Sequence, residues 1–190
     1  MDDAISFSPL HNHLLIAMPT LMDETFYRAV IFVCEHTREG ASGIIINQPL
    51  ELSLGELFER MDISPSSELT PDLPILLGGP LHPERGFVLH QDKTLWRSTF
   101  VIEDNIAITT SRDILESMAK GEHYHHTLVT LGYAGWSAGQ LEEEIRNNCW
   151  LIAPATPDIL FDTPFGQRWK AAAGLLGIDI NTISGFSGHG

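Results

Sequence analysis

Residues 127–142 read TLVTLGYAGWSAGQLE, and they contain both kinds of element from which the fold is built. Thr127 to Leu131 is a short run of aliphatic and β-branched residues, which predicts a buried strand. Ser137 followed by Gln140 fits a capping box, which predicts that a helix begins there. The glycine-rich residues between them indicate a tight turn. A strand followed closely by a helix is therefore the local unit.

Outward from this stretch the same signals recur. Short apolar runs bounded by glycine and proline predict strands over Leu14 to Met18, Phe26 to Cys34, Gly43 to Asn47, Pro74 to Leu77, Gly86 to His90, Ser98 to Ile102, Ile106 to Thr110 and Cys149 to Ala153. Caps followed by amphipathic spacing predict helices after Ser53, from Thr110 to Gly121, and from Thr163 to Gly177. Pro49 is expected to end the third strand.

The chain has 190 residues, of which 43% are hydrophobic and 19% charged, as in an ordinary folded domain. We find no internal repeat or linker, so we expect one compact domain over 1–190, with 1–12 and 185–190 loose. Consecutive strands in the first half favour antiparallel pairing, and the later helices exclude a plain sandwich. The pattern predicts a mixed α+β fold.

The formal net charge of −14 disfavours naked nucleic acid and anionic membranes as direct partners. The sequence begins without a basic region and apolar stretch of the secretory type, and its apolar runs are too short to span a bilayer. Two cysteines, Cys34 and Cys149, form no C-x-x-C pair and are expected to be free thiols. We therefore expect a cytoplasmic protein.

Gly135-x-Ser137-x-Gly139 matches the nucleophile-elbow pattern and lies between a strand and a helix, which raises the hypothesis of a small-molecule hydrolase. Its triad order would place an acid and then a histidine after the serine, and the only later histidine is His189. The serine also follows the apolar strand by several residues, and Ser137 with Gln140 explains a helix cap. We therefore prefer the cap and assign no catalytic residue.

Other reactive side chains have equally simple explanations. Cys34 and His36 would share one face of a regular strand, but Cys34 ends an apolar run and no third group orients the histidine. The spacings His11-x-His13 and His123-x-His125-His126 are compatible with Zn or Cu, yet no matching Asp or Cys accompanies them. We predict no metal and no cofactor.

Two glycine-rich turns are candidates for a shared pocket. Gly78-Gly79-Pro80 allows positive φ followed by a fixed exit. The later glycines, up to Gly139, would allow backbone N–H groups to approach a phosphate, but their spacing fits neither a dinucleotide loop nor a P-loop. The acidic residues that follow would oppose a polyanion.

Several segments together resemble the YqgE/AlgH family of bacterial proteins: Leu14 to Pro19, Phe26 to Val30, His36, Gly40 to Gly43, Asn47 to Pro49, Gly78 to Pro80, Gly132 to Trp136, Gly139 to Glu144, Asn148 and Trp150. The match covers nearly the whole chain in the same order. The resemblance implies a bent, partly barrel-like sheet flanked by helices. It also implies that the position of Ser137 is not restricted to serine, and it brings a label as a transcriptional regulator.

From these motifs we predict a small surface cleft formed by His36, Asn47, Gly78, Gly79, Pro80, Gly135, Trp136, Gln140 and Glu142. The acidic surface and the lack of a catalytic set favour a non-enzymatic regulatory or interaction protein that acts through protein partners or a small ligand. Two alternatives stay open. One is a small-molecule hydrolase that uses the turn at 135–139. The other is a transcriptional regulator, acting indirectly rather than by binding DNA.

Overall fold

A computed structural model describes residues 7–66 and 72–183. The strands of these residues are β1 (His13–Ala17), β2 (Val30–Thr37), β3 (Gly40–Ile45), β4 (Pro49–Ser53), β5 (Pro74–Leu77), β6 (Leu81–His90), β7 (Thr99–Glu103), β8 (Ile106–Thr109), β9 (Thr127–Ser137) and β10 (Trp150–Pro154). The helices are α1 (Leu54–Arg60), α2 (Arg112–Ala119), α3 (Gln140–Arg146), α4 (Arg168–Gly174) and α5 (Ile180–Ile183). A π-helical turn, Asp158–Asp162, and a 3₁₀ turn, Phe165–Gln167, precede α4.

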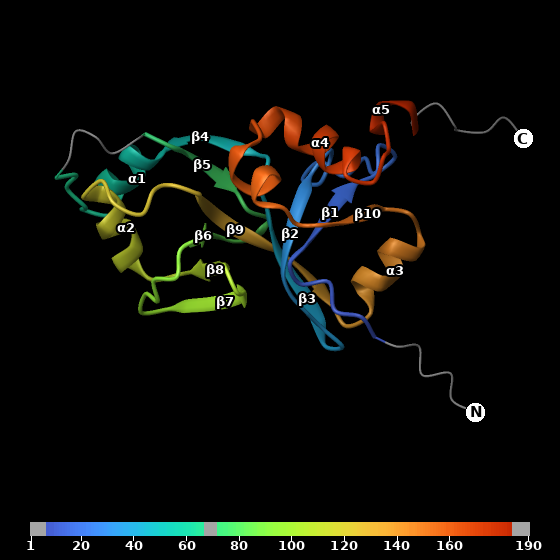
Figure 1. Ribbon diagram of the computed structural model, residues 1–190, viewed down its shortest axis with the longest axis horizontal. Coiled ribbons are helices and arrows are strands. Elements are labelled where there is room, and N and C mark those ends of the chain that lie inside the picture. The colour runs from blue at the N-terminus through green and yellow to red at the C-terminus, as the bar shows by residue number, and fades with distance from the viewer. Residues whose placement is uncertain (1–6, 67–71, 184–190) are drawn as a thin grey trace, which may run out of the picture.

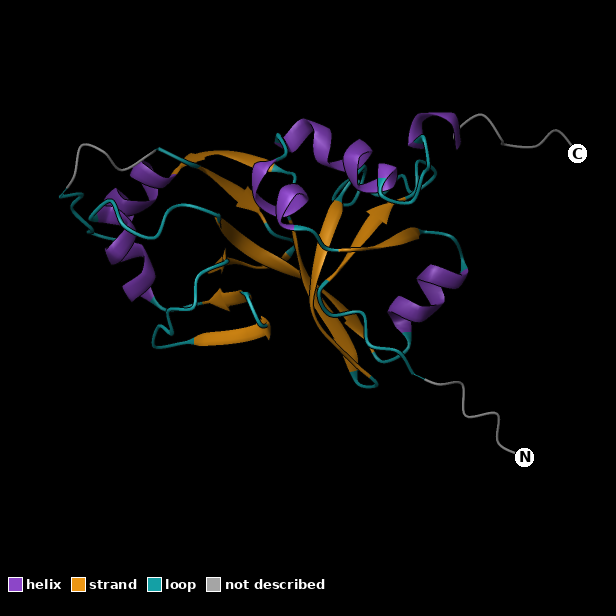
Figure 2. Ribbon diagram, in the orientation of Figure 1, coloured by secondary structure: helices purple, strands orange, loops and turns teal. Residues whose placement is uncertain are grey.

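The strands form one curled sheet in the order β10-β1-β2-β3-β9-β6-β8-β7, and every neighbouring pair along this path is antiparallel. β5 adds a parallel pairing to β9, with Leu76 opposite Thr130, and β4 pairs with β5. The sheet curls into a half-barrel with helices around it (Figures 1 and 2). This confirms the predicted α+β class with a mixed, partly barrel-like sheet in a single compact domain.

The central strands are buried on both faces, which explains why their sequences are continuous apolar runs. In β1, Leu14 and Ile16 join the core beneath α4, whereas Leu15 joins the core beneath α3. In β2, Phe32 and Ile31 divide between the same two cores. Side chains alternate across a strand, so a strand covered on both faces needs apolar residues at every position. A third core lies between the sheet and helices α1 and α2.

The first turn of α1 follows the predicted capping box. The Ser53 hydroxyl accepts a hydrogen bond from the Glu56 backbone N–H at 3.2 Å, and the Glu56 carboxylate accepts one from the Ser53 backbone N–H at 2.8 Å. These contacts satisfy two N–H groups that have no partner inside the helix. The predicted 98–110 hairpin is likewise confirmed as β7 and β8.

Two strand boundaries differ from prediction. β2 begins at Val30 rather than Phe26, because the Asp23 carboxylate accepts N–H bonds from Thr25 and Phe26 and holds a turn there. Pro49 was expected to end a strand, but it begins β4. Its missing N–H is tolerated because proline is compatible with the first residue of a strand.

The largest correction concerns the glycine-rich residues that follow Leu131. They do not form a turn, since β9 continues without interruption to Ser137. The first part of β9 pairs with β6 and the second with β3, so this one long strand connects the two halves of the sheet. Only the residues after Ser137 turn into α3.

Helix α4 is attached to the sheet through polar atoms as well as apolar packing. The buried Arg168 donates from Nη1 to the carbonyl oxygen of Ile46 at 2.7 Å, and Trp169 donates from Nε1 to the carbonyl oxygen of Ala17 at 2.8 Å. Burial lowers the pKa of Arg168 to about 10, so the guanidinium remains charged at neutral pH. Among the helices of the described residues, none has the length and apolar character that a membrane span requires.

Candidate functional site

Three polar side chains of α3, those of Gln140, Glu142 and Glu144, bond to residues of the sheet. Gln140 accepts from the Ser137 backbone N–H at 3.0 Å through its side-chain oxygen. The Glu142 carboxylate lies 2.7 Å from Nε2 of His36, whose side chain is only 3% exposed. These residues were predicted to border a cleft. The structure places them instead at the contact between α3 and the strands β2 and β9.

The tautomer of His36 follows from its neighbours. The backbone N–H of Leu10 points at Nδ1 with a donor–acceptor distance of 3.0 Å. A backbone N–H can only donate, so Nδ1 must carry a lone pair and Nε2 must carry the proton that is donated to Glu142. Both nitrogens of His36 are therefore engaged in contacts within the chain.

The carboxylate of Glu144 binds two indole groups at once. Its Oε2 accepts from Nε1 of Trp136 at 2.8 Å and from Nε1 of Trp150 at 2.9 Å, while Oε1 accepts from Gln140 at 3.2 Å. Both indole rings are nearly buried, and an unpaired buried N–H is costly. Glu144 thus gives the two tryptophans their hydrogen-bond partner and holds α3 against β9 and β10.

Ser137 does not form the N-cap that its spacing with Gln140 predicts. The residue at the N-cap of α3 is Gly139, in the left-handed region with φ of 76°. Ser137 remains in β9, and its hydroxyl lies 3.2 Å from the same Gln140 oxygen that binds its backbone N–H. Because an amide oxygen can only accept, the Ser137 hydroxyl is the donor in this contact.

The Gly78-Gly79-Pro80 segment crosses β9 at very short range. A Cβ atom on Gly79 would lie 2.1 Å from the carbonyl carbon of Tyr133, and one on Gly132 would lie 2.3 Å from the carbonyl oxygen of Gly79. The two glycine motifs therefore meet, as a packed crossing of two backbones with no room for a ligand between them.

Asn47 holds the start of β2 in place. Its side-chain oxygen accepts from the Val30 N–H at 2.9 Å, and its Nδ2 donates to the carbonyl oxygen of Arg28 at the same distance. The side-chain amide thus substitutes for a strand partner where β2 begins. This arrangement accounts for an asparagine that the sequence analysis placed in the cleft.

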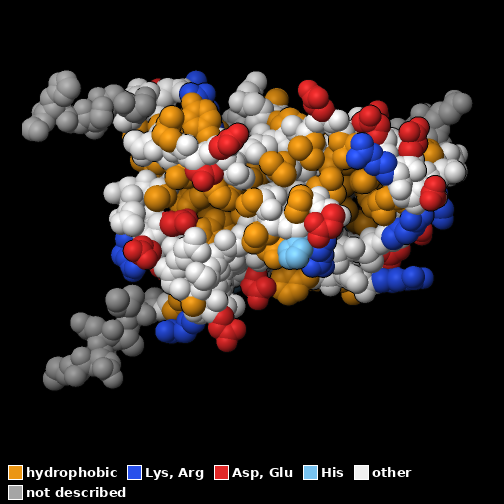
Figure 3. Space-filling model, turned by 180° about the vertical axis from the view of Figure 1, so that it is seen from behind, with side chains coloured by type: hydrophobic (Ala, Val, Ile, Leu, Met, Phe, Trp, Pro, Cys, Tyr) orange, Lys and Arg blue, Asp and Glu red, His pale blue; other side chains and the backbone are white. Residues whose placement is uncertain are grey.

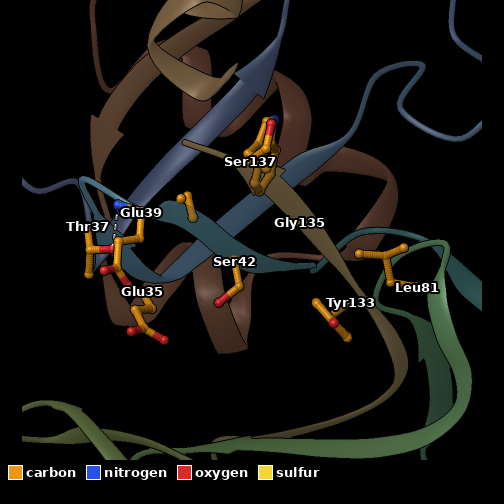
Figure 4. A pocket seen from close by; sticks show the side chains of 11 residues that line it. Glu35, Thr37, Glu39, Ser42, Leu81, Tyr133, Gly135 and Ser137 are labelled. Atoms are coloured by element: carbon orange, nitrogen blue, oxygen red, sulfur yellow. Dashed lines mark hydrogen bonds between the residues drawn. The ribbon is translucent and has the colours of Figure 1, made fainter. Parts of the chain in front are cut away.

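A groove does exist, on the other side of β9 from α3. It has two connected parts, with volumes of ≈510 and ≈350 Å³, which share Glu35, Ser42 and Tyr133 in their walls. Figure 4 shows Glu35 and Glu39 at one side and Leu81 and Tyr133 at the other, with Ser42 between them. The groove is open to solvent along its length. Its walls combine strands from both halves of the sheet.

A β-bulge at Cys34 decides which side chains of β2 reach the groove. Val33 lies opposite Gly43 and Glu35 opposite Ser42, so Cys34 is the extra residue. Both Cys34 and Glu35 consequently line the groove, whereas His36 contacts Glu142. The thiol–imidazole pair that a regular strand would allow is therefore not formed, in agreement with the preference for an inert cysteine.

The thiol at the groove wall is unreactive in character. Burial, followed by the nearby Glu35 charge, raises the pKa of Cys34 to about 12, and its Sγ lies 3.8 Å from the carbonyl oxygen of Phe32. At neutral pH the group is a neutral thiol, which behaves as a small apolar side chain.

The histidine clusters also have ordinary partners. His126 contacts Gln91 at 2.7 Å through Nδ1 and Asp162 at 3.1 Å through Nε2, and its ring stacks on His125. His13 contacts the carbonyl oxygen of His11 at 3.0 Å. Within residues 7–66 and 72–183, no group of three or more His, Cys, Asp or Glu side chains is placed to hold a metal ion.

Of the nine predicted cleft residues, Gly135 and Trp136 line the groove. The other wall residues were not predicted from the sequence, and they include Glu35, Glu39, Ser42, Leu81, Phe100 and Tyr133. A bulge brings part of this set together, and the β6 segment from Leu81 to Gly86 forms a second irregularity opposite β9. No local pattern marks either feature. The glycine motif around Tyr133 was the one available signal.

The comparisons with known proteins point to the same family. The model of a family described as AlgH-like (DUF179) matches residues 14–181. A UPF0301 protein of Methylococcus capsulatus is 51% identical over 181 residues, covering 95% of this chain and 96% of that protein. A UPF0301 protein of Xanthomonas campestris is 48% identical over 182 residues, covering 96% of this chain and 97% of the other.

Solved structures agree. The solution structure of the AlgH protein from Pseudomonas aeruginosa matches with a TM-score of 0.77 and 39% identity, covering 100% of both chains. A crystal structure of a Corynebacterium diphtheriae protein matches with a TM-score of 0.63 over 87% of this chain and 86% of that one. Its identity is 20%, so this second likeness concerns the fold alone.

Proposed function

The chain belongs to the AlgH-like family, and we propose that it is a non-enzymatic interaction protein that binds a protein partner in the groove of its half-barrel. The observation that carries the proposal is a contrast in hydrogen bonding. The polar side chains at the α3 contact are hydrogen-bonded within the chain, namely those of His36, Gln140, Glu142 and Glu144. The groove, by contrast, has polar and apolar side chains that are exposed to solvent. In the groove wall, Glu35 and Glu39 have no ion-pair partner among the described residues, so their carboxylates are available to another molecule.

Exposed apolar side chains at the rim support a protein partner. Leu81 is 41% exposed and Phe100 is 53% exposed, and both line the groove. Large apolar groups that face water in a concave site are typical of interaction surfaces. The open shape favours a polypeptide segment over a small ligand, because ligand pockets usually enclose most of the ligand surface.

A small ligand is the second occupant that we consider, because the two groove volumes of ≈510 and ≈350 Å³ fall within the range of ligand sites. The hydrolase hypothesis receives less support. The Ser137 hydroxyl donates to an amide oxygen, which cannot act as a general base. We therefore place the proposed activity in binding.

The proposal includes a cytoplasmic location and an indirect route to any regulatory effect. Cys34 and Cys149 are free thiols, which are usual in a reducing compartment. With a net charge of −14, the protein is expected to repel duplex DNA, so an effect on transcription would pass through the bound partner. Titration of duplex DNA at low salt should accordingly give no nanomolar binding.

Affinity capture from bacterial cytosol tests the proposal. The control Leu175→Ser alters an exposed leucine that directly follows α4 and does not line the groove. The wild-type chain and this control should retain the same partner. The double variant Leu81→Ser/Phe100→Ser should lose it. A partner that all three proteins retain, or no specific partner in repeated captures, would contradict the proposal. A small molecule released from the wild-type protein alone in native mass spectrometry would replace the protein partner with a ligand.

A further inference from the structure

We propose that the groove recognises an extended segment of the partner in which a large apolar side chain lies within two residues of a lysine or arginine. This inference rests on the proposed function and specifies its partner. It follows from a difference between the two connected parts of the groove. The ≈510 Å³ part has two carboxylates in its wall, and the ≈350 Å³ part has an apolar floor.

The acidic part is formed by Glu35 on β2 and Glu39 in the turn that leads to β3. Both residues are exposed, and neither carboxylate has an ion-pair partner in the described part of the chain. The intervening Arg38 is directed elsewhere, with its guanidinium carbon 5.5 Å from the centre of the Phe7 ring. A cationic side chain of a partner would provide charge-assisted hydrogen bonds that the chain itself does not supply.

The floor below this acidic pair is built from small residues. Gly40, Ala41 and Ser42 of β3 line the acidic part together with Gly135 of β9. Small side chains leave depth for a long lysine or arginine side chain to lie along the sheet. The stem of such a side chain is apolar and its charged end extends beyond it, which suits a shallow floor with carboxylates at its rim.

The apolar side chains of the second part come from five strands: Cys34, Ile44, Phe87, Phe100 and Ile108. Arg85 and Thr110 also line this part, and the Arg85 guanidinium carbon lies 5.7 Å from the centre of the Phe87 ring. Phe100 belongs to the edge strand β7 and is half exposed. Figure 3 shows how hydrophobic side chains gather among acidic and basic ones on the face seen from behind. Covering a half-exposed phenylalanine with an apolar side chain removes both surfaces from water, which is the main favourable term in association.

The two parts adjoin each other at Glu35, Ser42 and Tyr133, which line both. A partner side chain in the apolar part and a cation beside Glu35 must therefore be neighbours. In an extended chain, side chains two residues apart lie on the same face and are separated by about 7 Å. This spacing sets the limit of two residues in the proposed motif.

A displayed library of random peptides, selected on the full chain, tests the inference. Peptides bound by the wild-type protein should be enriched in Lys or Arg within two residues of Phe, Leu, Ile, Met or Trp. Binding of a selected peptide, followed by fluorescence anisotropy, should weaken at least about 10-fold in Glu35→Lys/Glu39→Lys and recover partly for peptides with the basic residue changed to Glu. The control Glu143→Lys makes the same type of substitution once, on the exposed side of α3, and should change binding less than about 2-fold.

The result separates the inference from the proposed function. Peptides that lose binding in Phe100→Ser but show no basic enrichment, or are unaffected by Glu35→Lys/Glu39→Lys, would overturn the inferred motif and leave groove binding intact. Peptides that bind every variant equally, or no selected peptide at all, would overturn both. Because all the changed side chains are exposed, each variant should unfold near the wild-type melting temperature. Measuring this temperature ensures that a loss of binding does not reflect unfolding.

Discussion

Strand β9 separates two regions that use similar residues in opposite ways. On one side, α3 brings Glu142 and Glu144 onto a histidine and two tryptophans, and each carboxylate is hydrogen-bonded to groups of the same chain. On the other side, Glu35 and Glu39 line an open groove and have no ion-pair partner within residues 7–66 and 72–183. Acidic and aromatic residues near a glycine motif therefore do not by themselves indicate a binding site. A better indication is a carboxylate that has no partner in the same chain and can still accept hydrogen bonds.

The largest effect is expected at the crossing that holds these two regions together. Gly79→Ala would place a methyl group 2.1 Å from the Tyr133 carbonyl carbon, which forces the two backbones apart. We expect a loss of about 3 kcal/mol or more in the free energy of unfolding, measured by urea denaturation. Gly166→Ala is the control, because nothing lies within 4 Å of its Cβ position. Equal stability of the two variants would show that the crossing is not under this constraint.

A smaller effect is expected from the carboxylate that serves both indoles. Glu144→Ala leaves the Nε1 groups of Trp136 and Trp150 without an acceptor, which should cost about 2 kcal/mol of stability in urea denaturation. Glu143→Ala removes an exposed carboxylate from the same helix and should change stability by less than about 0.5 kcal/mol. If both variants behaved alike, α3 would not be held by its polar contacts, and the contrast with the groove would weaken.

The smallest effect is a pH dependence that distinguishes the two kinds of carboxylate. Burial tends to raise the pKa of Glu142, but hydrogen bonds from its own backbone N–H and from His36, with the charge of Arg146, outweigh it, so the pKa lies below the ordinary 4.5. A lowered folded-state pKa stabilises the fold above the unfolded-state pKa, and this stability is lost as pH falls through the folded-state value.

Glu142→Gln should therefore be less stable than wild type at pH 7, and the difference should shrink as pH falls below about 4.5 in urea denaturation. Glu35→Gln changes an exposed carboxylate at the groove and should stay within about 0.5 kcal/mol of wild type at pH 7. A difference in the free energy of unfolding between Glu142→Gln and wild type that stayed constant down to pH 3 would contradict this. It would show that the contact with His36 does not depend on the charge of the carboxylate.

The sequence predicted those parts of the site that depend on short-range chemistry. The glycine motifs at 78–80 and 132–136 were recognised as places of special backbone geometry, and they do meet. Ser137 was recognised from the sequence as a partner of Gln140, but His36 was not recognised as the partner of Glu142. His36 is 106 residues from Glu142 along the chain. A contact over that separation cannot be inferred from local spacing.

By itself, the sequence determined the fold class, most of the strands and the capping of α1, because apolar periodicity and turn residues act over a few positions. Only the tertiary structure decided that β9 runs straight through its glycines and that a bulge turns Cys34 and Glu35 into the groove. It also decided that the sheet provides hydrogen-bond partners for the acidic residues of α3. These outcomes depend on which strands become neighbours in the curled sheet. Pairing partners distant in sequence set the register, and a change of one residue in register reverses the face on which every side chain lies.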